Sequence, residues 1–522
     1  MACGIILLAT LVFYVFPMRN RSLPFVCLSL FLSVVLPNAG RTNVIGFEVS
    51  PVFTGEEFRL LVQARFRGDA DGTTVVSLPY SYGGTTALYR CIRVVGAEAL
   101  LDTVRYTEDS SGLVLRHAPG QLVTLRYEVF QDIPGERVSM RYGFRPLLQP
   151  GWFHVLGSCL FLLPQDWRRY DVAIDWVKFP SDWVLHNSFG SQKTHQEINV
   201  EGNSWLESVF VGGDFRVLQT SVADRPVYLA LRGGGWSFSD SSLLEMLRST
   251  VEIQRNFWRD RDIPYYTVTL LPLAPRPAMG GARNYAQYQY MGIGLTNSFA
   301  AFATPSPGLT LDDLCHLFHH ELMHDWIGCK IRNGGPADDM SFGWFSEGFT
   351  EYFAYKNMLA GGFITPEQYV ERLNLNFIDP LYAQPMGQVS NKLVASGFFH
   401  CQDIAQLPYQ RGCIFAFYLD NAIKQHSGGQ ADLHDFMLEM LDHYYEADRD
   451  LFSDFDFFLK NLSRYLGEDA RPLYQRYINQ GELIPLETYR LPPYWRFIVD
   501  LDGLPILQLD QTVPGWREGM MR

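Results

Sequence analysis

The sequence has few charged residues, no paired-cysteine motif and no very long apolar run. Charged residues make up 19% of the 522 residues, below the roughly 25% that is usual for soluble domains. The formal net charge is −13, and an acidic surface repels phosphate backbones, which argues against nucleic acid as a partner. None of the 8 cysteines has CxxC spacing, which disfavours cysteine-ligated zinc and thioredoxin-type chemistry. We found no internal repeat, so the length predicts several ordinary globular domains.

The N-terminus has the composition of an export signal. Residues 1–40 contain no Asp, Glu or Lys, and their apolar stretches, 4–16 and 23–36, fall short of the ~18 residues that span a bilayer. The second stretch follows Arg19 and Arg21 and leads to the small residues of 37–40, which is typical of a cleavable signal. We expect a secreted or periplasmic protein. The alternative is an uncleaved signal anchor, the one case in which a membrane becomes a partner.

Six cysteines remain after residue 40, which is too few for a disulfide scaffold at this length. An oxidising compartment permits pairs such as Cys401 with Cys413, and buried free thiols are the alternative.

The pattern of apolar residues predicts a multidomain α+β protein. Short β-branched runs such as 58–66, 73–78, 122–130 and 170–176 indicate an N-terminal β-domain over 41–220. The period then changes to that of an amphipathic helix, which marks the start of a second domain. We therefore expect a signal at 1–40, the β-domain, an α+β catalytic domain at 221–440 and a helical C-terminal region at 441–522.

Three helices carry the informative residues. The first covers 311–327, with Thr310 and Asp313 in capping-box spacing and a stop before Gly328. The second is expected over 344–359 and the third over 411–426, each followed by a pair of glycines or by Ser-Gly-Gly.

The first helix contains the motif His320-Glu321-Leu322-Met323-His324. Histidines four residues apart project from one helical face toward a single ion, and Glu321 lies near enough to activate a water molecule. Zinc accepts imidazole nitrogens and in catalytic sites takes three protein ligands. His316 lies on the same face, but a polar neighbour or packed histidine is the better interpretation for it.

The third ligand is predicted on the second helix. Glu347 and Glu351 lie four residues apart in the aromatic segment 342–353. Carboxylates in such a setting are costly to bury unless they bind a metal or accept hydrogen bonds. We therefore interpret them as functional rather than as part of a solvated face.

These motifs resemble the gluzincin metallopeptidases. HHELMHDWIG followed by GWFSEGFTEYF is similar to the HExxH helix of that family and to its following helix, which bears the third ligand. The long loop between them, at 325–346, and the segments 211–216, 407–424 and 432–437 are more similar to the glycyl aminopeptidase branch than to the aminopeptidase-N-like branch. The resemblance covers about residues 165–490 and is weak over the β-domain.

The resemblance implies a thermolysin-like catalytic domain and an exported zinc metallopeptidase of aminopeptidase type that cleaves peptides or proteins. His320, His324 and Glu347 would hold one Zn²⁺, and Glu321 would act as general base. Glu351 would fix the tautomer of a histidine ligand. Tyr409 matches the family tyrosine that helps to hold the oxyanion.

One position departs from the family pattern. The family carries a glycine-rich edge strand that ends in a glutamate for the substrate's α-amine. We align this strand with the segment that contains Gly280, Gly281 and Ala282, which places Arg283 at the glutamate. A cation there would repel an N-terminal ammonium. The alternative hypothesis is therefore a zinc-retaining peptide-binding or scaffold protein with lost or altered exopeptidase activity.

Overall fold

The structure is a computed structural model. It describes residues 43–521 except 134, 136–141, 166–168, 261–263, 275–287, 333–339, 447–454 and 490. The predicted signal at 1–40 lies outside the described residues. None of the described helices combines the length and the apolar character needed to cross a membrane.

The first part of the described chain consists of β-sheets, as predicted. A six-stranded sheet has the order β15-β12-β1-β2-β9-β6, and a five-stranded sheet has the order β10-β11-β16-β13-β14. Phe47 from the first sheet and Phe153 from the second belong to one buried cluster. The strands and short helices of this β-region are β1 Asn43–Thr54, β2 Glu57–Arg67, β3 Thr73–Ser77, β4 Ser81–Tyr82, β5 Thr85–Thr86, η1 Leu88–Cys91, β6 Ile92–Glu98, β7 Arg105–Tyr106, β8 Gly112–Arg116, β9 Leu122–Phe130, β10 Leu147–Gln149, β11 Trp152–Leu156, α1 Gly157–Leu160, β12 Arg169–Trp176, β13 Val184–Asn187, β14 Gly190–Ser191, β15 His195–Glu201, α2 Gly202–Leu206 and β16 Val209–Gly213.

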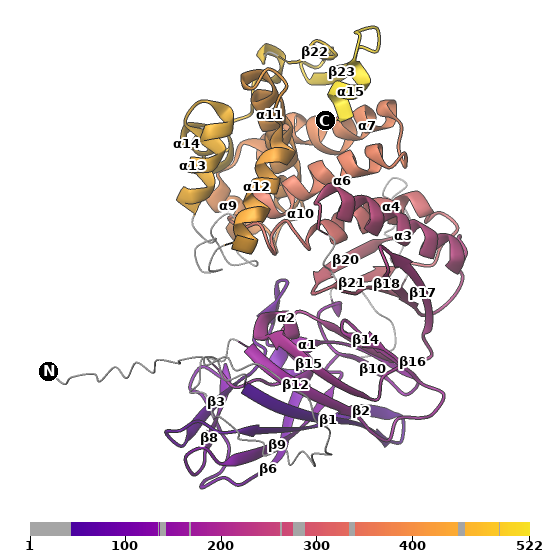
Figure 1. The fold of residues 1–522 in the computed structure, drawn as a ribbon, viewed down its shortest axis with the longest axis vertical. Helices are drawn as coiled ribbons and strands as arrows, with labels where there is room; N and C mark the ends of the chain where they lie inside the picture. Colours follow the sequence, from indigo (N-terminus) through magenta and orange to yellow (C-terminus); the bar gives the residue numbers. More distant parts are fainter. Residues whose placement is uncertain are drawn as a thin grey trace, which may run out of the picture. The chain divides into compact units, whose positions relative to one another are not determined.

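A second five-stranded sheet follows, in the order β17-β18-β19-β21-β20. Its central strands β18, β19 and β21 are parallel, and β20 pairs antiparallel with β21 as a hairpin. The helices α3 and α4 lie alongside this sheet, and α6 lies beyond α4 (Figure 1). The elements are β17 Arg216–Val222, β18 Arg225–Leu231, α3 Asp240–Phe257, β19 Tyr266–Pro272, β20 Tyr290–Leu295, β21 Ser298–Ala303 and α4 Leu311–Met323. The predicted domain boundary at 220 falls within β17.

Helices make up most of the remaining described chain. They are α5 Gly343–Ser346, α6 Gly348–Ala360, α7 Pro366–Leu373, the π-helix η3 Asn374–Ile378, α8 Asp379–Ala383, η4 Pro385–Gln388, α9 Asn391–Gly397, α10 Gln402–Ala405, α11 Leu407–His426, α12 Leu433–Glu446, α13 Phe455–Leu466, α14 Ala470–Leu473, η6 Tyr474–Asn479, η7 Leu486–Thr488 and α15 Trp516–Met521. The strands β22 Trp495–Val499 and β23 Pro505–Leu509 form a hairpin that the prediction of a helical end did not include.

The sheet of β17 to β21, the helices and the C-terminal segment share one hydrophobic core. A single cluster of buried side chains includes Val222 of β17, Phe318 of α4, Phe417 of α11 and Met520 of α15. No change of core accompanies the predicted boundary at 440, because Leu433 and Leu459 belong to the same cluster.

The helix that carries the predicted site begins as its sequence requires. The Thr310 hydroxyl accepts a hydrogen bond from the Asp313 N–H at 3.3 Å, and the Thr310 N–H donates to Asp313 Oδ2 at 2.8 Å. This capping box satisfies two N–H groups at the helix start. The helix ends at Met323 rather than at the predicted Ile327, and His324 is its C-cap.

Candidate metal centre

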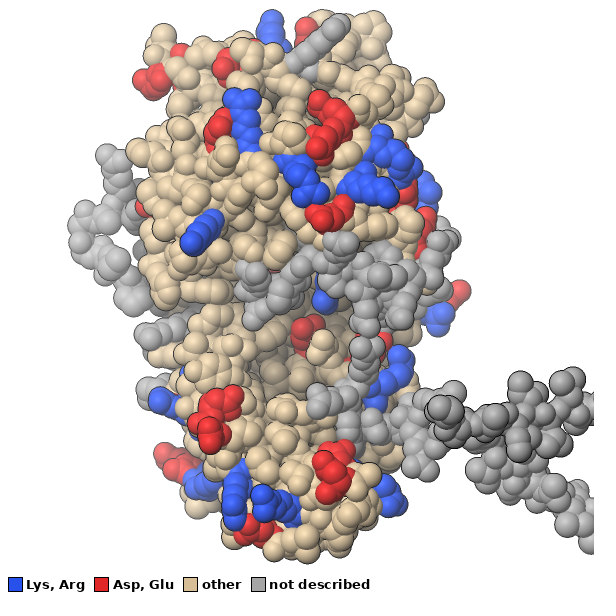
Figure 2. Space-filling model, turned by 90° about the vertical axis from the view of Figure 1, so that its left-hand side faces the viewer, with Lys and Arg blue, Asp and Glu red and all other residues tan. Residues whose placement is uncertain are grey.

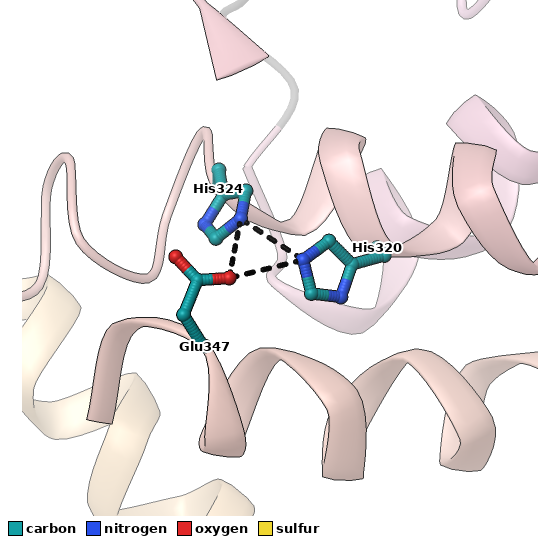
Figure 3. A group of neighbouring side chains, drawn as sticks. All are labelled: His320, His324 and Glu347. Carbon is teal, nitrogen blue, oxygen red and sulfur yellow. Dashed lines mark hydrogen bonds and ion pairs between the residues drawn. The ribbon is translucent and has the colours of Figure 1, made fainter. Parts of the chain in front are cut away.

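Two histidines meet at the C-terminal end of α4. His320 lies in the last turn and His324 follows as the C-cap. Their Nε2 atoms lie 3.2 Å apart. Figure 3 shows both rings turned toward the same point above the following helix.

Glu347 completes the cluster from the junction of α5 and α6. Its Oε2 lies 3.3 Å from His320 Nε2 and 3.6 Å from His324 Nε2. Zinc bonds of ~2.0–2.1 Å in a tetrahedral site place ligand atoms about 3.3 Å apart. The three separations therefore fit one tetrahedrally bound ion. Among the described residues, this is the group of three His, Cys, Asp or Glu side chains that could hold a metal.

The opposite nitrogen of each histidine is held by a second contact. His320 Nδ1 lies 3.2 Å from Glu351 Oε1, and His324 Nδ1 lies 3.3 Å from the Ile327 carbonyl oxygen. A proton on each Nδ1 leaves Nε2 free as a metal ligand. The structure thus places Glu351 beside His320, and its role in fixing the tautomer stays a prediction.

His316 contacts Glu351 rather than the metal cluster. Its Nε2 lies 2.8 Å from Glu351 Oε2, and its ring stacks on Tyr355 at 4.7 Å between centroids. Glu351 therefore bridges two imidazoles. The interpretation of His316 as a polar neighbour is consistent with this contact, which the sequence alone did not reveal.

The carboxylates of the cluster are held as anions. Burial opposes ionisation, but the neighbouring histidines outweigh it and keep the pKa of Glu347 and that of Glu351 well below their usual range. Burial also disfavours the charged form of His320, yet Glu351 and Glu347 raise its pKa well above the ordinary value. Two anionic carboxylates beside two imidazoles make a site that favours a cation.

Glu321 lies buried beside the ligands, and its environment suits a proton acceptor. Burial raises its pKa above the ordinary value, while His320 and His324 act in the opposite direction. A carboxylate with a raised pKa is a stronger base, and general bases work best when their pKa approaches the working pH.

Tyr409 reaches the cluster from α11. Its ring lies 5.9 Å from that of His320 between centroids. Burial and the nearby charge of Glu347 raise the pKa of its hydroxyl well above the ordinary value. Close approach of two helices makes this possible, because a Cβ on Gly348 would lie 2.3 Å from the Cα of Gly412. The tyrosine lies within the first turn of α11, whose start at Leu407 precedes the predicted one.

The strand β20 lies directly against the metal helix. A Cβ on Gly292 would lie 2.3 Å from the carboxyl carbon of Glu321, and one on Gly294 would lie 3.2 Å from the Cβ of His324. A larger side chain at either position would require β20 or the α4 side chains to move. The sequence analysis did not single out these glycines; their alternation in 291–295 is the signal that could have identified them.

Within the part of the chain that the structure describes, β20 is an edge strand of its sheet. The Thr304 N–H donates to the Gln289 carbonyl at 2.9 Å, which identifies these opposite residues as a hydrogen-bonded pair. Bonded pairs alternate along an antiparallel ladder, so the backbone groups of Gly292 and Gly294 point away from β21. The predicted substrate-binding residues Gly280, Gly281, Ala282 and Arg283 lie outside the described residues and stay a prediction.

Comparisons with known proteins give a family match and a similar fold. Residues 313–407 match the family described as M61 glycyl aminopeptidase. The fold is similar to the crystal structure of an aminopeptidase N family protein from Idiomarina loihiensis, with a TM-score of 0.64 and 16% sequence identity over 90% of this chain and 86% of that chain. No curated protein matches the chain in sequence.

These two matches support the assignment of the protein to the hydrolases, as a peptidase. Residues 313–407, which match the M61 glycyl aminopeptidase family model, include His320, His324, Glu347 and Glu351. The predicted family is confirmed.

Proposed function

We propose that the protein is an exported zinc metallopeptidase that hydrolyses peptide bonds. The observation that carries this proposal is the convergence of His320 Nε2, His324 Nε2 and Glu347 Oε2 at separations of 3.2, 3.3 and 3.6 Å. Imidazole and carboxylate ligands in a three-residue set suit catalytic zinc. A thermolysin-like arrangement of the catalytic region is part of the proposal.

A zinc ion held by these residues supplies a Lewis acid that polarises the scissile carbonyl and makes water more acidic. Glu321 removes the proton of the attacking water and delivers it to the leaving amine. The Tyr409 hydroxyl donates to the oxyanion as it develops, which stabilises the transition state more than the bound substrate. Glu351 keeps His320 oriented for ligation.

The substrate binds as an extended peptide along β20. The open backbone groups of Gly292 and Gly294 support this assignment, because a peptide that adds as a strand pairs with such an edge. The same two glycines let β20 itself approach Glu321 and His324, so a strand added at this edge lies near both side chains. The scissile bond thereby lies beside the general base.

Glu321→Gln tests the proposal. The variant keeps the size and burial of the side chain but loses the base, so we expect zinc content to stay at one ion per chain while peptide turnover falls by roughly 10²–10⁴-fold. The measurement pairs zinc analysis with hydrolysis of a peptide panel. Turnover equal to that of the unaltered protein would contradict the proposed mechanism.

A second candidate is a zinc-retaining peptide-binding or scaffold protein. Arg283 favours it if this cation occupies the position of the amine-binding glutamate. Free and N-acetylated forms of the same peptides separate the possibilities. Cleavage of free peptides supports an aminopeptidase, cleavage of blocked peptides alone supports an endopeptidase, and binding of either form without cleavage supports the scaffold.

The proposed partners and location follow from charge and from the N-terminus. Acidic and basic side chains are interspersed over the face in Figure 2, and the net charge of −13 gives a phosphate backbone little attraction. We therefore propose peptide or protein substrates, no nucleic acid, and a secreted or periplasmic protein that stays on the membrane only if residues 1–40 remain attached.

A further inference from the structure

Two buried cysteines of the β-region lie against each other. Cys91 ends η1 and Cys159 lies in α1, two short helices that pack together. Both side chains are 0% exposed and belong to one hydrophobic cluster. Cys159 is the largest influence that raises the pKa of the Cys91 thiol, so the two side chains are neighbours. A disulfide requires its two cysteines to lie close together in space. Cys91 and Cys159 meet this requirement although they are far apart in the chain.

The other described cysteines have different surroundings. Cys315 is buried beside His319, with 3.6 Å between Sγ and Nδ1, and Cys329 is exposed. All six described cysteines are free thiols in the structure, Cys91 and Cys159 as well as Cys401 and Cys413, the pair considered from the sequence. Cys413 is buried within α11. Among the described cysteines, Cys91 and Cys159 are the pair of which one thiol is seen to influence the other.

The two cysteines lie at the base of a hairpin that reaches the helical region. Cys159 Sγ lies 3.8 Å from the Phe144 carbonyl oxygen, and the Phe144 ring packs on Tyr82 of β4 at 5.4 Å between centroids. The hairpin of β4 and β5 then approaches Phe399, whose ring would lie 2.3 Å from a Cβ on Gly84. Phe399 lies between α9 and α10, shortly before the helix that carries Tyr409.

We propose that Cys91 and Cys159 form a disulfide bond that fixes the base of this hairpin when the chain folds in the presence of a disulfide oxidant. With glutathione disulfide, one cysteine thiolate attacks a glutathione sulfur and expels one glutathione thiolate. The second cysteine thiolate then attacks the protein sulfur of the mixed disulfide and expels the other. Two thiols are oxidised, one glutathione disulfide is reduced to two thiols, and the two protons pass to the glutathione thiolates.

The bond should form during folding rather than afterwards. Contact with Cys159 and burial raise the pKa of the Cys91 thiol well above its ordinary value, and a thiol attacks only as the thiolate. Glutathione disulfide added to the folded, reduced protein should therefore react at this pair much more slowly than during refolding.

The test is refolding of the full chain with glutathione disulfide, followed by tryptic mapping without reductant. Trypsin releases Cys91 in the peptide 91–93 and Cys159 in the peptide 142–168. We expect these two peptides as one linked species, 2 Da lighter than their sum, which separates on reduction. Unlinked peptides after refolding, glutathione on either cysteine, or a link from either cysteine to another residue would overturn the proposal.

A stability measurement provides an independent check. A bond between residues so far apart in sequence restricts the unfolded chain, so reduction should lower the thermal midpoint of the oxidised protein by about 5–10 °C. The matched variant Cys401→Ala should show the same loss on reduction, and Cys91→Ala with Cys159→Ala should show none. An equal loss in that double variant would contradict the assignment. Both measurements are independent of peptide hydrolysis.

Discussion

The substitution Gly292→Ala adds one carbon atom beside the site and thereby tests its geometry. A Cβ there would lie 2.3 Å from the carboxyl carbon of Glu321, closer than non-bonded carbons approach. In Gly292→Ala either β20 or the Glu321 side chain must move. A misplacement of about 1 Å can cost roughly 10²-fold in rate, so we expect a loss of that order in kcat/KM on a peptide substrate.

Gly46→Ala is the matched control, because it also adds a methyl group to a strand glycine but meets no atom within 4 Å. Its activity and thermal midpoint should stay close to those of the unaltered protein. Full activity in Gly292→Ala would show that β20 does not lie against Glu321 as described.

The sequence predicted the residues whose chemistry depends on local spacing. His320 and His324 meet because a helix places residues four apart on one face, and the structure brings Glu347 to them as predicted. Gly292 could not be found in this way. Its role depends on which strand borders the metal helix, and the segment that we aligned with the edge, around Arg283, lies earlier in the chain than β20.

At the scale of elements, Asp420 joins three helices in the buried core. Its Oδ2 accepts hydrogen bonds from the Tyr352 hydroxyl of α6 at 2.6 Å and from Lys424 Nζ of α11 at 2.8 Å. Its Oδ1 accepts from the Leu433 N–H at the start of α12 at 3.0 Å. Lys356 Nζ of α6 lies 3.6 Å from Oδ2. One carboxylate thus balances two buried ammonium groups.

Asp420→Asn should therefore destabilise the protein strongly. The variant removes the carboxylate charge that lies 3.6 Å from Lys356 Nζ and 2.8 Å from Lys424 Nζ, and breaking a buried ion pair costs about 3–5 kcal/mol. Lys356→Met should cost less, because it removes one of two like charges; burial already lowers the pKa of Lys356 to about 8 despite the attraction of Asp420. Urea unfolding measures both changes.

The exposed residue Asp502 supplies the control. Asp502→Asn should change the free energy of unfolding by no more than about 0.5 kcal/mol. A loss in Asp420→Asn as small as that of Asp502→Asn would show that the three helices do not depend on this carboxylate.

Element boundaries were predictable where the chain carries its own start or stop. The capping box at Thr310 set the start of α4, and Gly361 ends α6 close to the predicted position. The predicted helix over 344–359 is divided in the structure into α5 and α6, and Glu347 lies at the division. Periodicity does not report such a break, because apolar residues continue across it.

At the scale of the whole molecule, His154 of β11 lies where the β-region meets the sheet of β17 to β21. Its ring packs edge-on against Phe302 of β21, with 5.2 Å between centroids. Burial lowers its pKa to about 3 from the ordinary value of 6.5. Between these two values the unfolded chain binds a proton at His154 that the folded chain does not. The contribution of His154 to the free energy of unfolding is therefore fully present above pH 6.5 and is lost as the pH falls toward 3.

His154→Phe should flatten this dependence. The unaltered protein loses up to about 1.4 kcal/mol per pH unit at this residue, and the phenylalanine variant loses none there. The free energy of unfolding, measured by urea at pH 7, 6 and 5, gives the slope. His400→Phe, at an exposed position, should leave the slope unchanged; an unchanged slope in His154→Phe would contradict the account of its burial.

The arrangement of the whole chain was the hardest part to predict. The pattern of apolar residues predicted a β-rich first part and a helical later part, and the structure contains both. The shared core was not predictable, because apolar residues such as Leu507 of β23 give no sign in the sequence of which distant helices they will contact. The C-terminal hairpin was missed for the same reason: Pro492, Pro493 and Pro505 resembled loop punctuation.

The most direct test of the central claim is a zinc titration of the metal-free protein, followed by peptide hydrolysis. The account predicts no turnover without metal, a linear rise with added Zn²⁺, and a plateau at one ion per chain. His324→Ala, which removes one ligand, should neither retain the ion at this stoichiometry nor recover activity. Turnover by the metal-free protein equal to that of the zinc-loaded protein would contradict the claim.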